Sequence, residues 1–355
     1  MKNYILVIGF MLMSMLVFAQ DKPQDSLVVV AGNQEAELAY NKGVELFQSK
    51  NYQAAIDSFT AAIGYKPNFA KAYFNRANAK VALKDYKGAI EDYSMAITND
   101  TTGKEMVKAY YFRGRAKQIS GDKAGAIQDY QTAVDKGYKN AKAYYYIGMI
   151  KFLDGDYQGA LEAYNNAIKL DPKYADAYND RGSTYRKLKK YEEAVADYKM
   201  ATTLDPKMYF AFNNLGSVYR KLKKYDDAIA SYTMAINVKP DYYIAYNNRG
   251  AARIDKKDYD GAIKDFQKAT EVKKDYYLAY NNWGRALMKQ KKYEEAIKYF
   301  NKALEIKNDF GIVYVNRGIA KEELRKFKEA CADWQKAKEY GVKVAETYLQ
   351  ECKNN

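Results

Sequence analysis

The chain lacks histidine altogether, and its 355 residues include only five prolines and two cysteines. Without histidine there is no usual general base, no usual zinc ligand and no histidine-containing catalytic triad. The scarcity of proline, together with 37 tyrosines, favours packed helices over extended disorder. The composition therefore favours packed helices with a large core and argues against histidine-dependent catalysis and zinc binding. No enzymatic activity, metal site or cofactor is expected.

The charge is unbalanced toward the basic side. Lysine and arginine number 58 against 44 acidic residues, which gives a formal net charge of +14. Such a surplus attracts acidic proteins, anionic polysaccharide, membrane headgroups or nucleic acid, and composition alone does not choose among these partners.

Residues 1–19 have the layout of a signal peptide. A basic start precedes an apolar run of about 15 residues, shorter than the roughly 20 that a membrane-spanning helix needs. Val17 and Ala19 supply the small residues that signal peptidase requires, so cleavage is expected before Gln20. The sequence thus predicts a periplasmic or secreted protein with a leader over residues 20–35 and no stable membrane insertion after cleavage. The alternative is an uncleaved membrane anchor.

Small residues recur along the chain with a nearly constant spacing of 34. The series is Gly43, Ala77, Gly114, Gly148, Gly182, Gly216, Gly250, Gly284 and Gly318. An alanine follows each of them twelve residues later, from Ala55 to Ala330, and an aromatic residue follows each alanine, from Phe59 to Trp334. Two helices cross closely where Gly or Ala removes side-chain bulk, and an aromatic ring beside the crossing fills the remaining wedge.

This pattern resembles the tetratricopeptide repeat, which has a small residue at position 8, alanines at 20 and 27, an aromatic at 24 and often proline at 32. The resemblance covers residues 36–344 and implies nine helical hairpins stacked into a right-handed superhelical solenoid with a concave groove. The expected repeats are 36–69, 70–106, 107–140, 141–174, 175–208, 209–242, 243–276, 277–310 and 311–344. A three-residue insertion near Asn99 to Lys104 predicts a longer loop between repeats two and three.

The last repeat needs a cover for its apolar outer face, and residues 344–355 are expected to form a capping helix and tail. Five of these residues fall on one helical face: Val344, Ala345, Tyr348, Leu349 and Cys352. Cys331 and Cys352 lie level across the last hairpin, and export exposes them to an oxidising compartment. A disulfide between them is therefore predicted, the alternative being two buried thiols.

Arginine at position 7 and aspartate at position 23 occur together in five repeats and in no others. The arginines are Arg76, Arg113, Arg181, Arg249 and Arg317, and the aspartates are Asp92, Asp129, Asp197, Asp265 and Asp333. This co-occurrence predicts that each arginine pairs with the aspartate on the second helix of its own hairpin. The pairs are interpreted as structural, with ligand binding as the alternative.

Asparagines are concentrated at positions 5 and 6 of repeats five to nine, which face the groove in proteins of this family. The predicted groove residues are Asn179, Asn213, Asn214, Asn247, Asn248, Asn281, Asn282 and Asn316. An amide offers donors and an acceptor, so a row of amides can bind an extended peptide backbone without selecting its sequence. The row is similar to the one that lines the superhelix of O-GlcNAc transferase. The alternative is a general family preference for asparagine at position 6.

Repeats five and six both contain the sequence Tyr-Arg-Lys-Leu-Lys-Lys-Tyr. It places Arg186, Lys187, Arg220 and Lys221 at groove-facing positions 12 and 13 of the resembled family. These cations favour an acidic protein or peptide partner, the alternative being a solvated basic edge that aids solubility.

The sequence therefore predicts a non-catalytic scaffold of the periplasm or cell envelope that binds peptide segments of protein partners. Chaperone tails are poor candidates, because position 5 is never lysine and position 6 is never arginine, unlike in the carboxylate clamp of chaperone-binding relatives. The alternative function is binding of anionic envelope polysaccharide through a basic groove. Core positions 17 and 24 account for twelve of the 37 tyrosines, which weakens that alternative, and export argues against nucleic acid.

Overall fold

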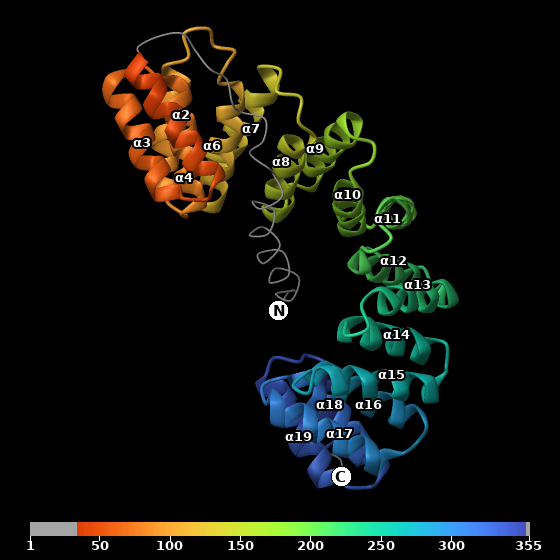
Figure 1. The fold of residues 1–355 in the computed structure, drawn as a ribbon. Coiled ribbons are helices and arrows are strands. Elements are labelled where there is room, and N and C mark those ends of the chain that lie inside the picture. Colours follow the sequence, from red (N-terminus) through yellow and green to blue (C-terminus); the bar gives the residue numbers. More distant parts are fainter. Residues whose placement is uncertain (1–33, 353–355) are drawn as a thin grey trace. The chain divides into compact units, whose positions relative to one another are not determined.

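The computed structural model describes residues 34–352, and every regular element in that range is an α-helix (Figure 1). The signal peptide and most of the leader predicted from the sequence lie outside the described residues. The described chain divides into two compact units, one ending at Ile147 and the other beginning at Gly148, so the boundary falls within α8 (Ala141–Leu153). The prediction of an all-α solenoid of hairpins is confirmed.

The first unit contains three complete hairpins. Its helices are α2 (Gln34–Gln48), α3 (Tyr52–Tyr65), α4 (Ala70–Ala82), α5 (Tyr86–Thr98), α6 (Val107–Ile119) and α7 (Lys123–Asp135). The first helix starts two residues before the expected repeat boundary, whereas α4 and α6 begin at the first residues of repeats two and three.

The second unit contains the end of α8 with its partner α9, five complete hairpins and a final short helix. Its helices are α9 (Tyr157–Leu170), α10 (Ala175–Lys187), α11 (Tyr191–Leu204), α12 (Tyr209–Lys221), α13 (Tyr225–Val238), α14 (Tyr243–Asp255), α15 (Tyr259–Val272), α16 (Tyr277–Lys289), α17 (Tyr293–Ile306), α18 (Gly311–Glu323), α19 (Phe327–Glu339) and α20 (Ala345–Glu351).

The repeating glycines allow the two helices of a hairpin to cross. A Cβ atom added to Gly216 would lie 2.8 Å from the ring of Tyr232, and one on Gly284 would lie 2.6 Å from the ring of Phe300. Both rings are essentially inaccessible to solvent, so they fill the crossing as the sequence predicts.

Several second helices begin with an aspartate cap. Asp85 and Asp258 each accept a hydrogen bond from the backbone N–H three residues later, at Gly88 (3.0 Å) and Gly261 (2.9 Å). The bond satisfies one of the free N–H groups at the helix start, and glycine there leaves room for the carboxylate.

The C-terminal helix α20 covers the end of the second unit. Ala345 is fully buried and Tyr348 stacks on Trp334 at 4.9 Å between ring centroids. One member of the predicted capping face is wrong: Val344 is 46% exposed, because it precedes the first turn of α20, and Val342 packs against the core in its place.

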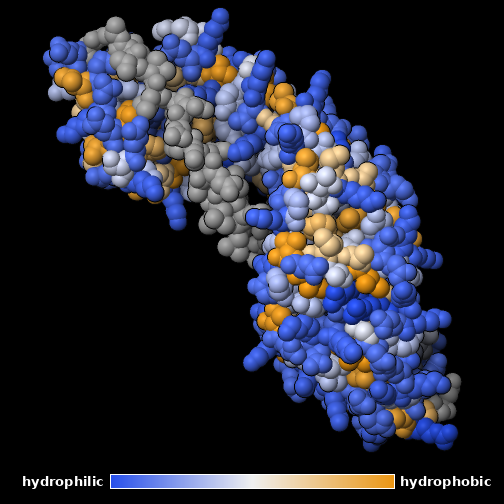
Figure 2. Space-filling view, turned by 45° about the vertical axis from the view of Figure 1, so that its right-hand side comes forward, coloured by the Kyte–Doolittle hydropathy of each residue, from blue (hydrophilic) through white to orange (hydrophobic). Residues whose placement is uncertain are grey.

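Among residues 34–352, no helix combines the length and apolar character that crossing a bilayer requires. The face seen in Figure 2 is predominantly hydrophilic, with apolar residues in separate patches.

Candidate functional site

The first helices of repeats six to nine lie side by side in the second unit. α12, α14, α16 and α18 contact one another in this order. Positions 2, 6, 9 and 13 are spaced by three or four residues, so they form one stripe along each of these helices. The stripes together make a continuous surface that carries five of the twelve predicted groove residues, namely Asn214, Lys221, Asn248, Asn282 and Asn316.

The middle of this surface is a hydrogen-bonded row of amides. We call the position-6 asparagines Asn214, Asn248, Asn282 and Asn316 the amide row. The side-chain NH₂ of each donates to the side-chain oxygen of the position-5 asparagine in the preceding repeat. The bonds run from Asn214 to Asn179 (3.2 Å), Asn248 to Asn213 (2.9 Å), Asn282 to Asn247 (2.9 Å) and Asn316 to Asn281 (2.9 Å). The amide row therefore joins neighbouring repeats and is fixed in orientation.

The position-5 asparagines are not a contact surface, which corrects the prediction that both positions line the groove. Asn179, Asn213, Asn247 and Asn281 are only 4–7% exposed. A buried amide needs a hydrogen-bond partner, and the bonds donated by the amide row supply one to each of them. These four residues hold the amide row, whose own members stay half-buried and keep a second N–H each.

The amide row is flanked by apolar side chains on one side. We call the position-2 residues Phe210, Ile244, Leu278 and Ile312 the apolar row. Phe210, Ile244 and Leu278 are partly exposed, and Ile312 is 36% exposed. The first turn of each helix thus offers an apolar contact next to an amide.

The other flank carries charge of both signs, with basic residues on α12 and α16 and with Asp255 and Glu323 at position 13 of α14 and α18. We call Arg220, Lys221, Arg285 and Lys289 the cationic edge. Arg285 donates a hydrogen bond to the side-chain oxygen of Asn282 (3.2 Å), which brings the cationic edge against the amide row. The Arg285 side chain is exposed, but desolvation by the atoms packed around its base, and then the neighbouring positive Arg220, lower the pKa of its guanidinium.

The four basic residues predicted from repeats five and six differ in availability. Arg220 is paired with Asp255 of the next repeat at 2.6 Å, so part of its charge is neutralised. Lys187 and Lys221 are exposed, whereas Arg186 is half-buried near Tyr198. Burial raises the pKa of the Tyr198 hydroxyl, and Arg186 opposes that rise.

The predicted arginine–aspartate pairs are all present. Each arginine meets its aspartate through Nε and a terminal nitrogen, as in Arg181, whose two bonds to Asp197 measure 2.7 and 2.6 Å. The same arrangement holds Arg76 to Asp92, Arg113 to Asp129, Arg249 to Asp265 and Arg317 to Asp333. The aspartates are at most 5% exposed, so the pairs are structural and do not face a ligand.

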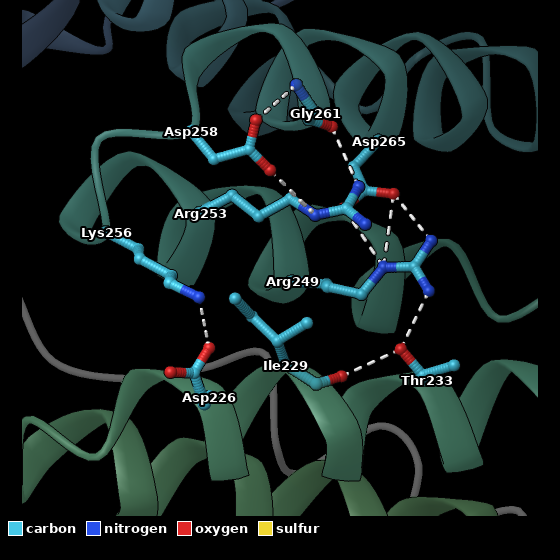
Figure 3. Close-up of polar contacts among 9 residues, drawn as sticks. All are labelled: Asp226, Ile229, Thr233, Arg249, Arg253, Lys256, Asp258, Gly261 and Asp265. Atoms are coloured by element: carbon cyan, nitrogen blue, oxygen red, sulfur yellow. Dashed lines mark hydrogen bonds and ion pairs between the residues drawn. The ribbon is translucent and has the colours of Figure 1, made fainter.

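Each of these arginines also reaches the preceding repeat, a contact that the sequence analysis missed. Arg249 donates to the hydroxyl of Thr233 on α13 (2.9 Å) while it binds Asp265 on α15 (Figure 3). The equivalent acceptors are Thr60, Ser94, Asn165 and Asn301. The acceptors stand at position 25 of their repeats, where Ser, Thr or Asn occurs only if the next repeat has arginine at position 7; the other repeats have Gln or Lys there. This co-occurrence in the sequence could have predicted the contact between repeats.

A second cation completes four of the five clusters. Asp265 also binds Arg253 at 2.8 Å, and Arg253 donates a hydrogen bond to the carbonyl of Gly261 (Figure 3). Lys80, Lys117 and Lys321 play the same part for Asp92, Asp129 and Asp333. Repeat five has Tyr185 at this position, so Asp197 depends on Arg181. Burial raises the pKa of both Asp197 and Asp265, and their arginines oppose the rise.

Cys331 and Cys352 are joined as a disulfide that ties α20 to α19. We expect thiol titration of the denatured, unreduced mature protein to detect no reactive thiol, because both sulfurs are bonded. The same titration after reduction should detect two thiols. Two reactive thiols before reduction would show that the bond does not form in the protein.

Within residues 34–352, no three His, Cys, Asp or Glu side chains gather in a way that could hold a metal ion. The surface of amides, apolar groups and cations offers hydrogen bonding, apolar contact and charge. These groups suit noncovalent contact with a polypeptide chain.

Family models described as "Tetratricopeptide repeat" match residues 40–104, 111–167, 175–208, 209–242, 243–276 and 277–310. A further model, described as "TPR repeat", matches residues 148–189. The matches cover every hairpin before the last one.

Two known proteins are similar to this chain in sequence over about 80 residues each. The "DnaJ homolog subfamily C member 7 homolog" of Dictyostelium discoideum is 41% identical over 80 residues, which are 21% of this chain and 15% of that protein. The "Small glutamine-rich tetratricopeptide repeat-containing protein 2" of Saccharomyces cerevisiae is 41% identical over 78 residues, 22% of each chain. The chain thus spans less than a quarter of either relative.

A solved structure, that of a tetratricopeptide repeat protein from Parabacteroides merdae, has the same fold. It superposes with a TM-score of 0.56 at 20% identity and covers 69% of this chain and 98% of its own.

Proposed function

The chain belongs to the tetratricopeptide repeat family, whose members generally bind proteins. We propose that it holds extended peptide segments of protein partners on the surface formed by the first helices of repeats six to nine. The observation that carries this proposal is the amide row, in which one asparagine per repeat is held at a constant position by a buried asparagine. A row of fixed donors suits a peptide backbone, which offers an acceptor at every residue.

The two flanks of the amide row support a more specific ligand. The apolar row favours aliphatic or aromatic side chains, and the cationic edge favours carboxylates. Packed helices lie about 8–10 Å apart and an extended chain rises about 3.3 Å per residue, so roughly three peptide residues pass each repeat. The proposed ligand is therefore an extended segment with apolar residues recurring about every third position and acidic residues about every sixth, because the cationic edge lies on α12 and α16 only.

A polysaccharide ligand finds less support in this surface. Sugar and base rings bind to exposed aromatic faces, whereas the recurring rings Tyr198, Tyr232 and Phe266 are essentially fully buried in the hairpin crossings. A peptide ligand can instead contact the amide row and the apolar row, which are partly exposed.

We expect a fluorescent twelve-residue peptide with this pattern to bind the mature chain at least about tenfold more tightly than a scrambled peptide of equal composition. Replacing Arg285 and Lys221 by alanine should weaken binding and reduce its dependence on salt, because two attracting charges are lost. Lys264→Ala, an exposed lysine on the second helix α15, is the matched control and should change nothing. Fluorescence anisotropy at several salt concentrations measures these effects, and equal affinity for both peptides would reject the proposal.

We further propose that the protein is exported and cleaved before Gln20, and that it acts in the periplasm or outside the cell without catalysis. The apolar run of residues 4–18 and the small residues Val17 and Ala19 support this placement. Mass spectrometry of the N-terminal peptide from the envelope fraction would test it, with an intact Met1 in a membrane pellet as the contrary result.

A further inference from the structure

The turns that join the two helices of each hairpin hold a basic residue in an uncommon backbone conformation. Within residues 34–352, every residue with positive φ that is not glycine is lysine or arginine, and each stands at position 15 of its repeat. These residues are Lys50, Lys84, Lys189, Lys223, Lys257, Lys291 and Arg325. Repeats three and four have Gly121 and Gly155 there, also with positive φ. Position 15 therefore requires the left-handed conformation, which glycine adopts more easily than lysine.

The basic side chains at position 15 add nothing to the packing of the repeats. A Cβ atom added to Gly121 or Gly155 would meet no atom within 4 Å. All seven basic residues are exposed, and none of their side chains forms an ion pair or hydrogen bond with another described residue. A cation near the end of a helix favours the helix dipole, but Lys187 and Lys221 at position 13 already supply one. The lysines at position 15 are therefore available to a partner.

Positive charge is most concentrated in the turns of repeats five and six. The first helices of these repeats, α10 and α12, contact each other, so the turns that follow them lie side by side. We call the six exposed lysines of this region the lysine patch: Lys187, Lys189, Lys190, Lys221, Lys223 and Lys224. They outnumber the acids that begin α11 and α13, which are Glu192, Glu193, Asp226 and Asp227. Asp226 is already bound by Lys256 of repeat seven, which increases the positive excess.

The chemistry of the lysine patch differs from that of a protein interface. Lysine is depleted at protein–protein interfaces, and their centres are apolar. The apolar residues of the two turns, Leu188 and Leu222, are half-buried, so the patch offers charge with little apolar contact. A bilayer with anionic headgroups requires only this, and clusters of about four to eight lysines or arginines are typical of its attachment sites.

We propose that the lysine patch docks the protein on an anionic lipid surface, a role separate from peptide binding by the amide row. The ammonium groups contact the headgroups, and no segment enters the hydrocarbon. The backbone at Lys189 and Lys223, with φ of 61° and 60°, keeps a lysine where glycine would be less strained. The contact is electrostatic, so it weakens as salt shortens the range of the charges.

Co-sedimentation of the mature chain with phosphatidylcholine vesicles tests this role. We expect binding when the vesicles contain about 30% phosphatidylglycerol and little binding without it. Lys189→Gly combined with Lys223→Gly should weaken binding about 25-fold, because one lysine near an anionic surface contributes roughly fivefold. The same variant should lose no stability in denaturant unfolding, because glycine relieves the left-handed backbone. Binding and stability thus respond differently to one change.

Lys50→Gly combined with Lys84→Gly is the matched control. It removes the same charge and makes the same backbone change in the first unit, where position 16 is Asn51 or Asp85 in place of a lysine. Vesicle binding should stay within about twofold of that of the unmodified chain. Equal weakening by both pairs would show that net charge alone attracts the vesicles, and it would overturn the proposal.

Two other results would also reject the lipid surface. One is a Lys189→Gly, Lys223→Gly variant that binds vesicles as tightly as the unmodified chain. The other is tighter binding of soluble polygalacturonate than of vesicles, which would identify a flexible polyanion as the ligand. This variant should bind the patterned peptide as before, so the two proposals are tested independently.

Discussion

Replacing Arg181 by alanine is expected to lower the free energy of unfolding by about 3–5 kcal/mol, because Asp197 would remain buried without a cation. Asp197 is 5% exposed and binds Arg181 through both carboxylate oxygens. Replacing Arg249 should cost roughly half as much, because Asp265 keeps Arg253 at 2.8 Å.

Hydrogen exchange and denaturant unfolding of the mature chain would compare the two variants. Exchange is needed because a repeat protein gains its stability from neighbouring repeats and can open locally. Lys187→Ala removes an exposed cation from the same helix as Arg181 and should leave both measurements unchanged. Equal losses in Arg181→Ala and Arg249→Ala would show that the second cation has no compensating role.

The pH dependence gives this prediction an independent check. Burial already raises the pKa of Asp197 while Arg181 opposes the rise, so removing Arg181 should raise that pKa further. A carboxyl group with a higher pKa in the folded than in the unfolded state binds a proton on folding, and the stability of the variant should fall as pH rises through the raised pKa. The penalty of Arg181→Ala is therefore expected to be smaller near about pH 4 than near pH 7.

The repeat period was sufficient to predict the hairpins and the contacts within them. A fixed spacing of Gly, Ala and aromatic residues specifies how two helices cross, and Gly216 and Tyr232 meet as that spacing requires. The pairing of positions 7 and 23 could also be predicted, because both residues belong to one repeat and change together.

Contacts between repeats were harder to predict, because they depend on how one hairpin stacks on the next. The bond from Arg249 to Thr233 spans 16 residues backward, just as the bond to Asp265 spans 16 forward, but the former crosses a repeat boundary. The amide row follows the same principle: Asn248 was expected to face a ligand, and its bond to Asn213 shows that it also holds two repeats together. The loop predicted between repeats two and three is present between α5 and α6, but periodicity gives no information on its path.

Replacing Asn248 and Asn282 by alanine is expected to cost about 2–6 kcal/mol, the second large effect, because each change leaves a buried amide oxygen without its donor at about 1–3 kcal/mol per site. The stranded acceptors are those of Asn213 and Asn247, both 7% exposed. Peptide binding should be lost in the same variant, so stability and binding fall together and the two roles of the row are not yet separated.

A fourfold variant separates them. Adding Asn213→Val and Asn247→Val removes the stranded acceptors. Valine fits at position 5 of a repeat, because Val315 occupies that position in α18 and is 3% exposed. Replacing both partners of a buried hydrogen bond by apolar groups can be nearly neutral, so most of the lost stability should return, as measured by denaturant unfolding. Peptide affinity should not return, because the amide row still lacks two members. Recovered binding in the fourfold variant would show that the asparagines only join the repeats, and that the flanking apolar row and cationic edge bind the peptide without them.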